Sequence, residues 1–202
     1  MDMISENNML QLVGTLAGRP AFSHGSRGLD FWGFPLSVRR LSGTEDLINV
    51  IARRELLETL ELTEGRKLCL SGELRSFNNR HGDGARLVIT AFARQLSLCG
   101  GEDENRLLLR GTLCKPPKLR QTPLGRDICD LMLAVNRPYG RSDYLPCICW
   151  GGLARQAAHW EVGERLRLEG RVQSRRYIKL TDAGPAERTA YEVSVLTAEI
   201  SN

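Results

Sequence analysis

Arginine and aromatic side chains gather on one side of a predicted strand in the second half of the chain. Period-two alternation from residue 165 onward predicts an inward face of Leu166, Leu168, Gly170 and Val172. The outward face is a mostly basic row that ends in an aromatic ring: Arg165, Arg167, Glu169, Arg171, Gln173, Arg175 and Tyr177. Cations neutralise phosphates and flat rings stack on unpaired bases, so this row has the chemistry that single-stranded nucleic acid requires. A solvated sheet face is the alternative interpretation.

Further aromatic candidates precede this strand. In residues 143–150 the aliphatic and thiol side chains suit the interior, namely Leu145, Cys147 and Cys149. Tyr144 and Trp150 then point outward as candidate stacking rings, although a core position for Trp150 stays open. The turn before this segment places two arginines around a tyrosine: Arg137, Tyr139 and Arg141.

The first half of the chain repeats this pattern with weaker chemistry. Alternation over residues 67–79 predicts an inward face of Leu68, Leu70, Gly72 and Leu74. The candidate binding residues of this half are basic, aromatic or amide side chains: Arg39, Arg40, Arg75, Phe77, Asn79 and Arg80. Single exposed apolar residues are common on protein surfaces, so Phe77 alone is weak evidence.

These candidates lie on an internal repeat. The pattern Asn-x5-Gly-Thr-Leu-x3-Pro occurs at residues 8–20 and again, 97 residues later, at 105–117. Farther along, Gly72 matches Gly170 at an offset of 98. Solenoid repeats have periods of about 20–50 residues, so this spacing predicts two copies of one domain. We expect an N-terminal domain at 1–99, a linker at 100–104 and a C-terminal domain at 105–202.

Each copy shows the pattern of three strands, one short helix and two further strands. In the first copy the strands lie near 9–16, 29–40, 46–51, 67–77 and 86–96, with the helix at 53–60. In the second they lie near 106–113, 127–137, 143–150, 165–177 and 190–199, with the helix at 152–160. A helix between strands three and four matches the OB-fold, a five-stranded Greek-key barrel. The sequence therefore predicts an all-β protein of two tandem OB-fold barrels. A two-sheet sandwich is the alternative, but it gives no reason for the helix.

Metal, cofactor and enzyme chemistry find little support. The six cysteines contain no CxxC pair and have no histidine at ligand spacing, so we expect them to be reduced and mostly structural: Cys69, Cys99, Cys114, Cys129, Cys147 and Cys149. A disulfide or redox role is the alternative. The three histidines belong to no catalytic motif, and no carboxylate pair is recognisable. We expect no enzyme activity, no cofactor and no metal.

Composition and charge leave the class of partner open. The net charge is +4, with 12 basic and 11 acidic side chains in residues 1–101 against 16 and 13 in residues 102–202. This mild excess is weak evidence for nucleic acid on its own. No apolar run approaches the roughly 20 residues of a membrane span, and the polar start does not resemble a secretory signal. We therefore expect a cytoplasmic protein with no membrane partner.

The second copy resembles the bacterial single-stranded DNA-binding protein family. The resemblance rests on the Asn-x5-Gly-Thr-Leu-x3-Pro pattern, on residues 133–135 and on residues 170–177. Four aromatic positions of that family stack on bases, and all four are aromatic here: Tyr139, Tyr144, Trp150 and Tyr177. In the first copy the same positions fall on Ser42, Leu47, Ala52 and Asn79, and Phe77 lies two residues early.

This resemblance implies sequence-tolerant binding of single-stranded DNA in replication, recombination or repair. The implied phosphate contacts are Arg137, Arg141, Arg171, Arg175, Arg176 and Lys179. The family works with four OB-folds, which implies a homodimer of this two-domain chain, located in bacteria and associated with the nucleoid. The acidic C-terminal tip with which family members recruit other proteins is missing from the sequence. The alternatives are an RNA-binding or primosome-assembly OB-fold protein, and an interaction module whose first copy builds the dimer.

Overall fold

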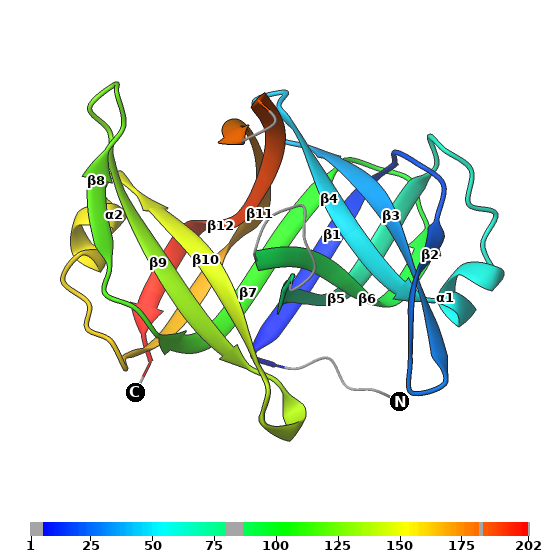
Figure 1. The fold of residues 1–202 in the computed structure, drawn as a ribbon, viewed down its shortest axis with the longest axis horizontal. Helices are drawn as coiled ribbons and strands as arrows, with labels where there is room; N and C mark the ends of the chain where they lie inside the picture. The colour runs from blue at the N-terminus through cyan, green and yellow to red at the C-terminus, as the bar shows by residue number, and fades with distance from the viewer. Residues whose placement is uncertain (1–5, 80–86, 182–183, 202) are drawn as a thin grey trace.

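The computed structural model describes residues 6–79, 87–181 and 184–201, and strands dominate these ranges (Figure 1). The first half contains β1 (Asn8–Leu16), β2 (Ala21–Ser26), β3 (Leu29–Arg39), β4 (Glu45–Arg53), α1 (Arg54–Glu58), β5 (Lys67–Asn78) and β6 (Leu87–Leu98). The second half contains β7 (Glu104–Leu113), β8 (Lys118–Gln121), β9 (Asp127–Asn136), η1 (Pro138–Gly140), β10 (Ser142–Trp150), α2 (Gly151–Ala157), β11 (Arg165–Thr181) and β12 (Gly184–Ile200). The helix lies at the predicted point in each half.

The strands form two barrels that stand side by side in Figure 1. In the first barrel β3 pairs with β1 and β4, and a short parallel contact joins β4 to β6, so that the sheet closes through β5. The second barrel repeats these pairings with β7, β9, β10, β11 and β12. The predicted fold of two tandem OB-fold barrels is confirmed. β7 begins at Glu104, inside the predicted linker, and the domain limits stay a prediction.

Two strands escaped the sequence analysis. β2 and β8 pair with the first part of β3 and β9 in hairpins that extend beyond the barrels. Every residue of both strands is exposed. A strand without a buried face has no alternation of apolar and polar residues, so the pattern that marks the other strands is missing here.

The ribbon of β11 and β12 is longer than predicted. Both strands run for 17 residues, and their pairing continues to the Thr181–Gly184 pair, whereas the sequence predicted ends at residues 177 and 190. In Figure 1 the ribbon rises out of the second barrel toward the loop between β3 and β4. The extra residues are largely outside the core, so their burial pattern does not mark them as strand.

The two barrels share a continuous sheet. β1 and β7 pair antiparallel from Asn8 opposite Leu109 to Val13 opposite Glu104. Leu10 lies opposite Leu107, and these two residues are 97 positions apart, so the pair marks a pseudo-two-fold axis between the repeats. The sheet order across this junction is β6-β5-β1-β7-β11-β12. The duplication has therefore produced a pseudo-dimer inside one chain.

Two buried Asp–Arg ion pairs, one in each barrel, hold the barrels together. Asp46 is fully buried, and its carboxylate accepts hydrogen bonds from Arg40 Nε and Nη2 at 2.6 Å each. The same carboxylate accepts the backbone amide of Ser174, from the other half of the chain, at 2.7 Å. The Ser174 hydroxyl also accepts the backbone amide of Leu47 at 3.1 Å. We call this set of contacts, made by Arg40, Asp46 and Ser174, an interdomain lock. It joins the start of β4 to β11.

The second lock is the symmetric counterpart of the first. Asp143 is fully buried and accepts Arg137 Nε at 2.5 Å and the backbone amide of Ser76 at 2.5 Å. Ser76 Oγ accepts the backbone amide of Tyr144 at 2.8 Å, and Arg137 Nη2 donates to the Ser76 carbonyl at 3.1 Å. Each half thus inserts a serine beside the other half's buried Asp–Arg pair.

The repeated glycine of β5 and β11 has a steric cause. A Cβ atom on Gly72 would lie 2.0 Å from the Phe92 carbonyl oxygen, and one on Gly170 would lie 2.3 Å from that of Ser194. The strand shifts register at this point in both barrels. Only glycine allows so close an approach to the neighbouring backbone.

The cysteine prediction and the position of Trp160 can be checked against the core. All six cysteines are free thiols, and Cys129, Cys147 and Cys149 are buried. Burial raises the pKa of Cys147 and, with the nearby Cys129, raises that of Cys149 to about 12. Trp160 lies in the core, as its position on a helical apolar face suggests.

Among the described residues, no helix has the length and apolar character needed to cross a lipid bilayer.

Candidate nucleic-acid interface

The outer side of the second barrel carries the predicted aromatic and basic residues. We call it the C-face and define it by residues on the side of these strands away from the core: Ile128, Asp130, Tyr144, Ile148, Trp150, Arg171, Gln173, Arg175, Tyr177, Glu192 and Ser194. Four of them are themselves buried, namely Ile128, Ile148, Gln173 and Ser194. The strand registers place Asp130, Ile148, Ser194 and Arg171 in one row across four strands. The opposite side of β10 packs into the core, as predicted. The C-face therefore extends across four neighbouring strands of the second barrel, in the order β9, β10, β12 and β11.

Tyr144 and Trp150 lie on this face at the two ends of β10. The Tyr144 side chain is 49% exposed, whereas Trp150 is half-buried. The guanidinium carbon of Arg126 lies 5.7 Å from the centre of the Trp150 ring. Sequence reasoning missed Arg126, which belongs to the exposed β8–β9 hairpin. The pairing of Trp150 with Ile128 brings that hairpin beside the ring, so correct pairing of β9 with β10 would have found it.

Tyr177 and Arg175 lie together on the ribbon. The Arg175 guanidinium carbon is 5.9 Å from the centre of the Tyr177 ring, on a stretch of β11 that extends past the barrel. Arg176 points to the other side of the ribbon, where its Nη1 lies 3.7 Å from Glu187. Lys179 continues the row in sequence, but its side chain lies outside what the structure describes.

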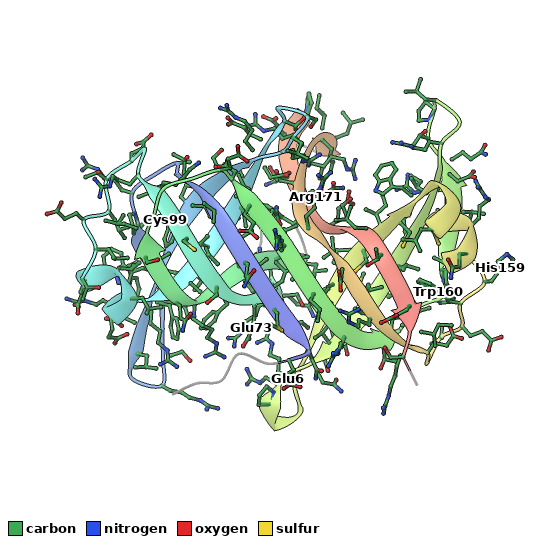
Figure 2. The ribbon with its side chains drawn as sticks, turned by 180° about the vertical axis from the view of Figure 1, so that it is seen from behind. Glu6, Glu73, Cys99, His159, Trp160 and Arg171 are labelled. Carbon is green, nitrogen blue, oxygen red and sulfur yellow. The ribbon has the colours of Figure 1, made fainter. Side chains whose placement is uncertain are left out.

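Arg171 is the most unusual basic residue of the C-face. Its side chain is half-buried, and its Nε is buried without a hydrogen-bond partner in the described structure. Figure 2 shows Arg171 near the junction of the two barrels, at the base of the ribbon. A desolvated N–H without an acceptor is costly, so an incoming oxygen acceptor would bind it favourably.

Acidic side chains on the C-face are already paired. Asp130 accepts Arg120 Nε and Nη2 at 2.6 and 2.9 Å, and Glu192 accepts the Gln173 amide at 2.7 Å. The ion pair with Arg120 reduces the repulsion that the Asp130 carboxylate would exert on a phosphate backbone.

Two predicted contacts lie at η1. The backbone of Tyr139 is in this turn, but its side chain is outside what the structure describes. Arg141 is exposed and follows the turn. Arg137, immediately before it, is committed to the lock with Asp143, and Arg40 is committed in the same way to Asp46. Their guanidinium groups hold the two barrels together in this structure.

The equivalent surface of the first barrel, the N-face, is filled by its own side chains. The same registers place Gly33, Ile51, Phe92 and Glu73 in one row. Glu73 is buried and accepts Arg75 Nη2 at 2.9 Å and Arg94 Nη2 at 3.1 Å. Figure 2 shows Glu73 on the first barrel, across the junction from Arg171.

Aromatic rings complete this cluster. The Arg75 guanidinium carbon lies 3.8 Å from the centre of the Phe92 ring, and burial lowers the pKa of Arg75 despite the neighbouring Glu73. Phe31 lies 5.8 Å from Phe92 between ring centres, and His24 stacks on Phe31 at 4.9 Å. The predicted contact Arg75 is therefore internally engaged.

The remaining predicted residues of the first half are scattered. Phe77 is 52% exposed beside Asn79, and Arg39 forms an exposed ion pair with Glu45. Arg80 lies outside the described residues. The structure also corrects one correspondence: Trp150 ends β10 opposite Ile128, and Arg53 ends β4 opposite Phe31, so Trp150 matches Arg53 and not Ala52.

No group of three or more histidine, cysteine, aspartate or glutamate side chains in the described ranges is placed to hold a metal ion.

Comparison with known protein families gives a match in the second half of the chain. Residues 104–201 match the model of the single-strand binding protein family. Single-stranded DNA-binding protein 3 of Listeria innocua is 38% identical over 80 residues, which cover 36% of this chain and 50% of that protein. The single-stranded DNA-binding protein of Halalkalibacterium halodurans is 35% identical over 80 residues, covering 36% and 48%. The chain thus spans about half the length of the curated relatives it matches.

A solved structure matches nearly the whole chain. The wild-type single-stranded DNA-binding protein from Thermus aquaticus superposes with a TM-score of 0.78 at 24% identity, covering 96% of this chain and 93% of that one. At this identity the match supports the fold, including the order of two OB-fold barrels in one chain.

Proposed function

We propose that this protein binds single-stranded DNA with little sequence preference, because residues 104–201 match the model of the single-strand binding protein family. The curated relatives named above are single-stranded DNA-binding proteins. Binding would serve DNA replication, recombination or repair in a bacterial cytoplasm, on nucleoid DNA.

The observation that carries this proposal is the composition of the C-face. It combines the rings of Tyr144, Trp150 and Tyr177 with Arg171 and Arg175 on one continuous surface. Stacking on a ring tolerates any base because every base has a π-face. The arginines supply the charge for phosphates, and Arg126, Arg141, Arg176 and Lys179 extend this charge along the hairpin, the turn and the ribbon.

The stacking rings and the phosphate-binding arginines should each make their own contribution to the binding free energy. Each stacked base contributes roughly 1–3 kcal/mol by alanine substitution. Each neutralised phosphate lowers the slope of log K against log salt concentration by about 0.7 for a single strand. The binding constant should therefore fall steeply between low and physiological salt.

The test is a titration of the full chain with a fluorescein-labelled dT oligomer, followed by anisotropy. Trp150→Ala combined with Tyr177→Ala should raise the Kd at least tenfold. Phe22→Ala is the matched control, since Phe22 is an exposed aromatic on β2, away from the C-face. An unchanged Kd in the double variant would refute the assignment of the site. An RNA oligomer of equal length in the same assay measures the preference for DNA.

We also propose that two chains associate, so that the active unit has four OB-folds. This proposal follows from the family's use of four such domains and from the presence of two barrels in this chain. Multi-angle light scattering should give twice the chain mass of 22.6 kDa. A monomer at micromolar concentration would contradict it.

A further inference from the structure

The two barrels contain equivalent hollows at the place where the first strand of each barrel separates from its neighbour. In the first barrel the hollow is lined by Thr15, Arg39, Lys67 and the linker residues Glu102 and Asp103, among others. In the second barrel a hollow of about 460 Å³ is lined by Asn7, Arg110, Thr112, Asn136, Arg165 and Arg167, among others. Thr15 corresponds to Thr112, Arg39 to Asn136 and Lys67 to Arg165 in the repeat.

The first hollow already holds an anionic group. The Asp103 carboxylate accepts the backbone amide of Arg39 at 2.6 Å and pairs with the Lys67 ammonium. The Asp103 side chain is only 14% exposed there. The first barrel thus shows what this geometry binds: a negatively charged oxygen between a strand amide and a cation.

The second hollow keeps the same donors without that carboxylate. The repeat places Glu6 at the position of Asp103, yet Glu6 is exposed and does not line the hollow. Arg137 donates its amide to the Arg141 carbonyl, and consecutive strand amides point in opposite directions. The amide of Asn136 therefore points away from β10, as that of Arg39 points away from β4.

The basic side chains of this hollow carry an excess of charge. Arg110 and Arg165 are exposed and form no ion pair within the described residues, while Arg167 pairs with Glu169 and Glu199. The strand register places Arg110 directly opposite Arg167, so like charges stand side by side. Because Arg167 already has two carboxylate partners, an anion in the hollow would bind chiefly to Arg110 and Arg165.

The lining of the hollow lies close in sequence to one end of the proposed DNA site. Asn136 lies two residues before the start of η1, and Arg141 immediately follows η1. Tyr144 lies at the same end of β10. In Figure 2 Glu6 lies at the lower edge of the molecule beside this turn. A strand that leaves the C-face past η1 would therefore meet the hollow next.

We propose that the hollow formed by Arg110, Thr112, Asn136 and Arg165 binds a phosphate of the same single-stranded DNA after it leaves the C-face. This inference rests on the proposed function. It also explains why the first barrel lacks such a path: the Asp103 carboxylate occupies the equivalent hollow as an internal phosphate mimic.

The experiment compares a short and a long DNA with the full chain. OB-folds occupy about 4–16 nucleotides each, so labelled dT8 serves as a probe for the C-face and dT20 for the C-face with its extension. Arg110→Gln with Arg165→Gln removes the free cations of the hollow. Arg54→Gln with Arg106→Gln removes the same net charge from two surface ion pairs, with Glu58 and Glu104.

For the hollow variant we expect the affinity for dT20 to fall about tenfold at low salt, and that for dT8 to stay within about twofold. The salt slope for dT20 should become less steep by about 0.7, the value for the one phosphate that the hollow would hold. Equal losses for dT8 and dT20, or a dT20 loss no larger than in the control, would overturn the inference and leave the proposed function intact.

Two further outcomes are decisive. A wild-type chain that binds neither oligomer would refute the proposed function itself, and the inference with it. An aspartate-rich octapeptide that binds the wild type but not the hollow variant, with dT20 binding unchanged in that variant, would make the hollow a peptide site and contradict the phosphate assignment.

Discussion

The N-face and the C-face occupy equivalent places on two copies of one barrel, yet they differ in what fills them. At the centre of each row, Phe92 of the N-face corresponds to Ser194 of the C-face, and Glu73 corresponds to Arg171. In the N-face, Glu73 forms ion pairs with Arg75 and Arg94, and the Phe92 ring lies against the Arg75 guanidinium. The C-face has a small residue there and an arginine whose Nε has no hydrogen-bond partner among the described residues.

This difference teaches how a duplicated domain can diverge without losing its fold. The scaffold features are kept in both copies: the close-approach glycines, the buried Asp–Arg pairs and the strand pairing across the pseudo-two-fold axis. The outward residues are free to change because they do not support the core. The comparison therefore predicts equal responses to scaffold mutations and unequal responses to surface mutations.

The largest expected effect concerns the locks that both barrels share. Asp46→Ala and Asp143→Ala each leave a half-buried arginine and a serine amide without their acceptor. Breaking a buried pair by removing one partner costs roughly 3–5 kcal/mol, so both variants should lose about that free energy of unfolding in urea. Arg39→Gln, in an exposed pair, should lose less than about 1 kcal/mol. Markedly unequal losses for the two aspartates would show that the scaffolds are not equivalent.

The next effect separates the two faces. Arg171→Gln should weaken binding of labelled dT20 about tenfold with little change in stability, because hydrogen bonds to charged groups contribute roughly 1.5–3 kcal/mol. Arg75→Gln should do the reverse: Kd within about twofold, and a stability loss of about 1–2 kcal/mol from the lost ion pair and ring contact. Anisotropy and urea unfolding on both variants measure this contrast. A loss of affinity in the Arg75 variant equal to that in the Arg171 variant would remove the distinction between the faces.

A smaller effect concerns pH and the thiols of the second barrel. The pKa of Cys149 is raised to about 12 from an ordinary value of 9.0, so above pH 9 the unfolded chain releases this proton while the folded chain keeps it. Stability must then fall as pH rises, by about 1.4 kcal/mol per pH unit for this thiol. Unfolding in urea at pH 8 and pH 10 should show that Cys149→Ala removes about that much of the loss. Cys99→Ala, at a partly exposed thiol of the first barrel, should remove less. Equal changes in the two variants would argue against this account.

Much of this molecule follows from local patterns in the sequence. Alternation identifies the inward residues of β10 and β11, and hence the outward positions of Tyr144, Trp150 and Arg171. The repeat and the helix position together predict the two barrels. These inferences work because a strand with one buried face has a period of two, whatever the rest of the chain does.

The features that escaped prediction depend on pairings between distant strands. Arg40 and Arg137 resemble free surface cations in the sequence, and only the fold places a buried aspartate and a serine from the other half against them. The contrast between Phe92 and Ser194 also requires the short parallel contacts of β4 with β6 and of β10 with β12. Arg126 meets Trp150 through an exposed hairpin without a hydrophobic pattern.

The most direct test of the account uses the three tryptophans of the chain as local reporters. Trp32→Phe with Trp160→Phe leaves Trp150 on the C-face, and Trp150→Phe with Trp160→Phe leaves Trp32, which is half-buried in the first barrel. Both double variants are titrated with poly-dT at low salt, and tryptophan fluorescence is recorded. We predict strong quenching of Trp150 and little change in Trp32. Quenching of Trp32 as strong as that of Trp150 would contradict the assignment of DNA binding to the C-face.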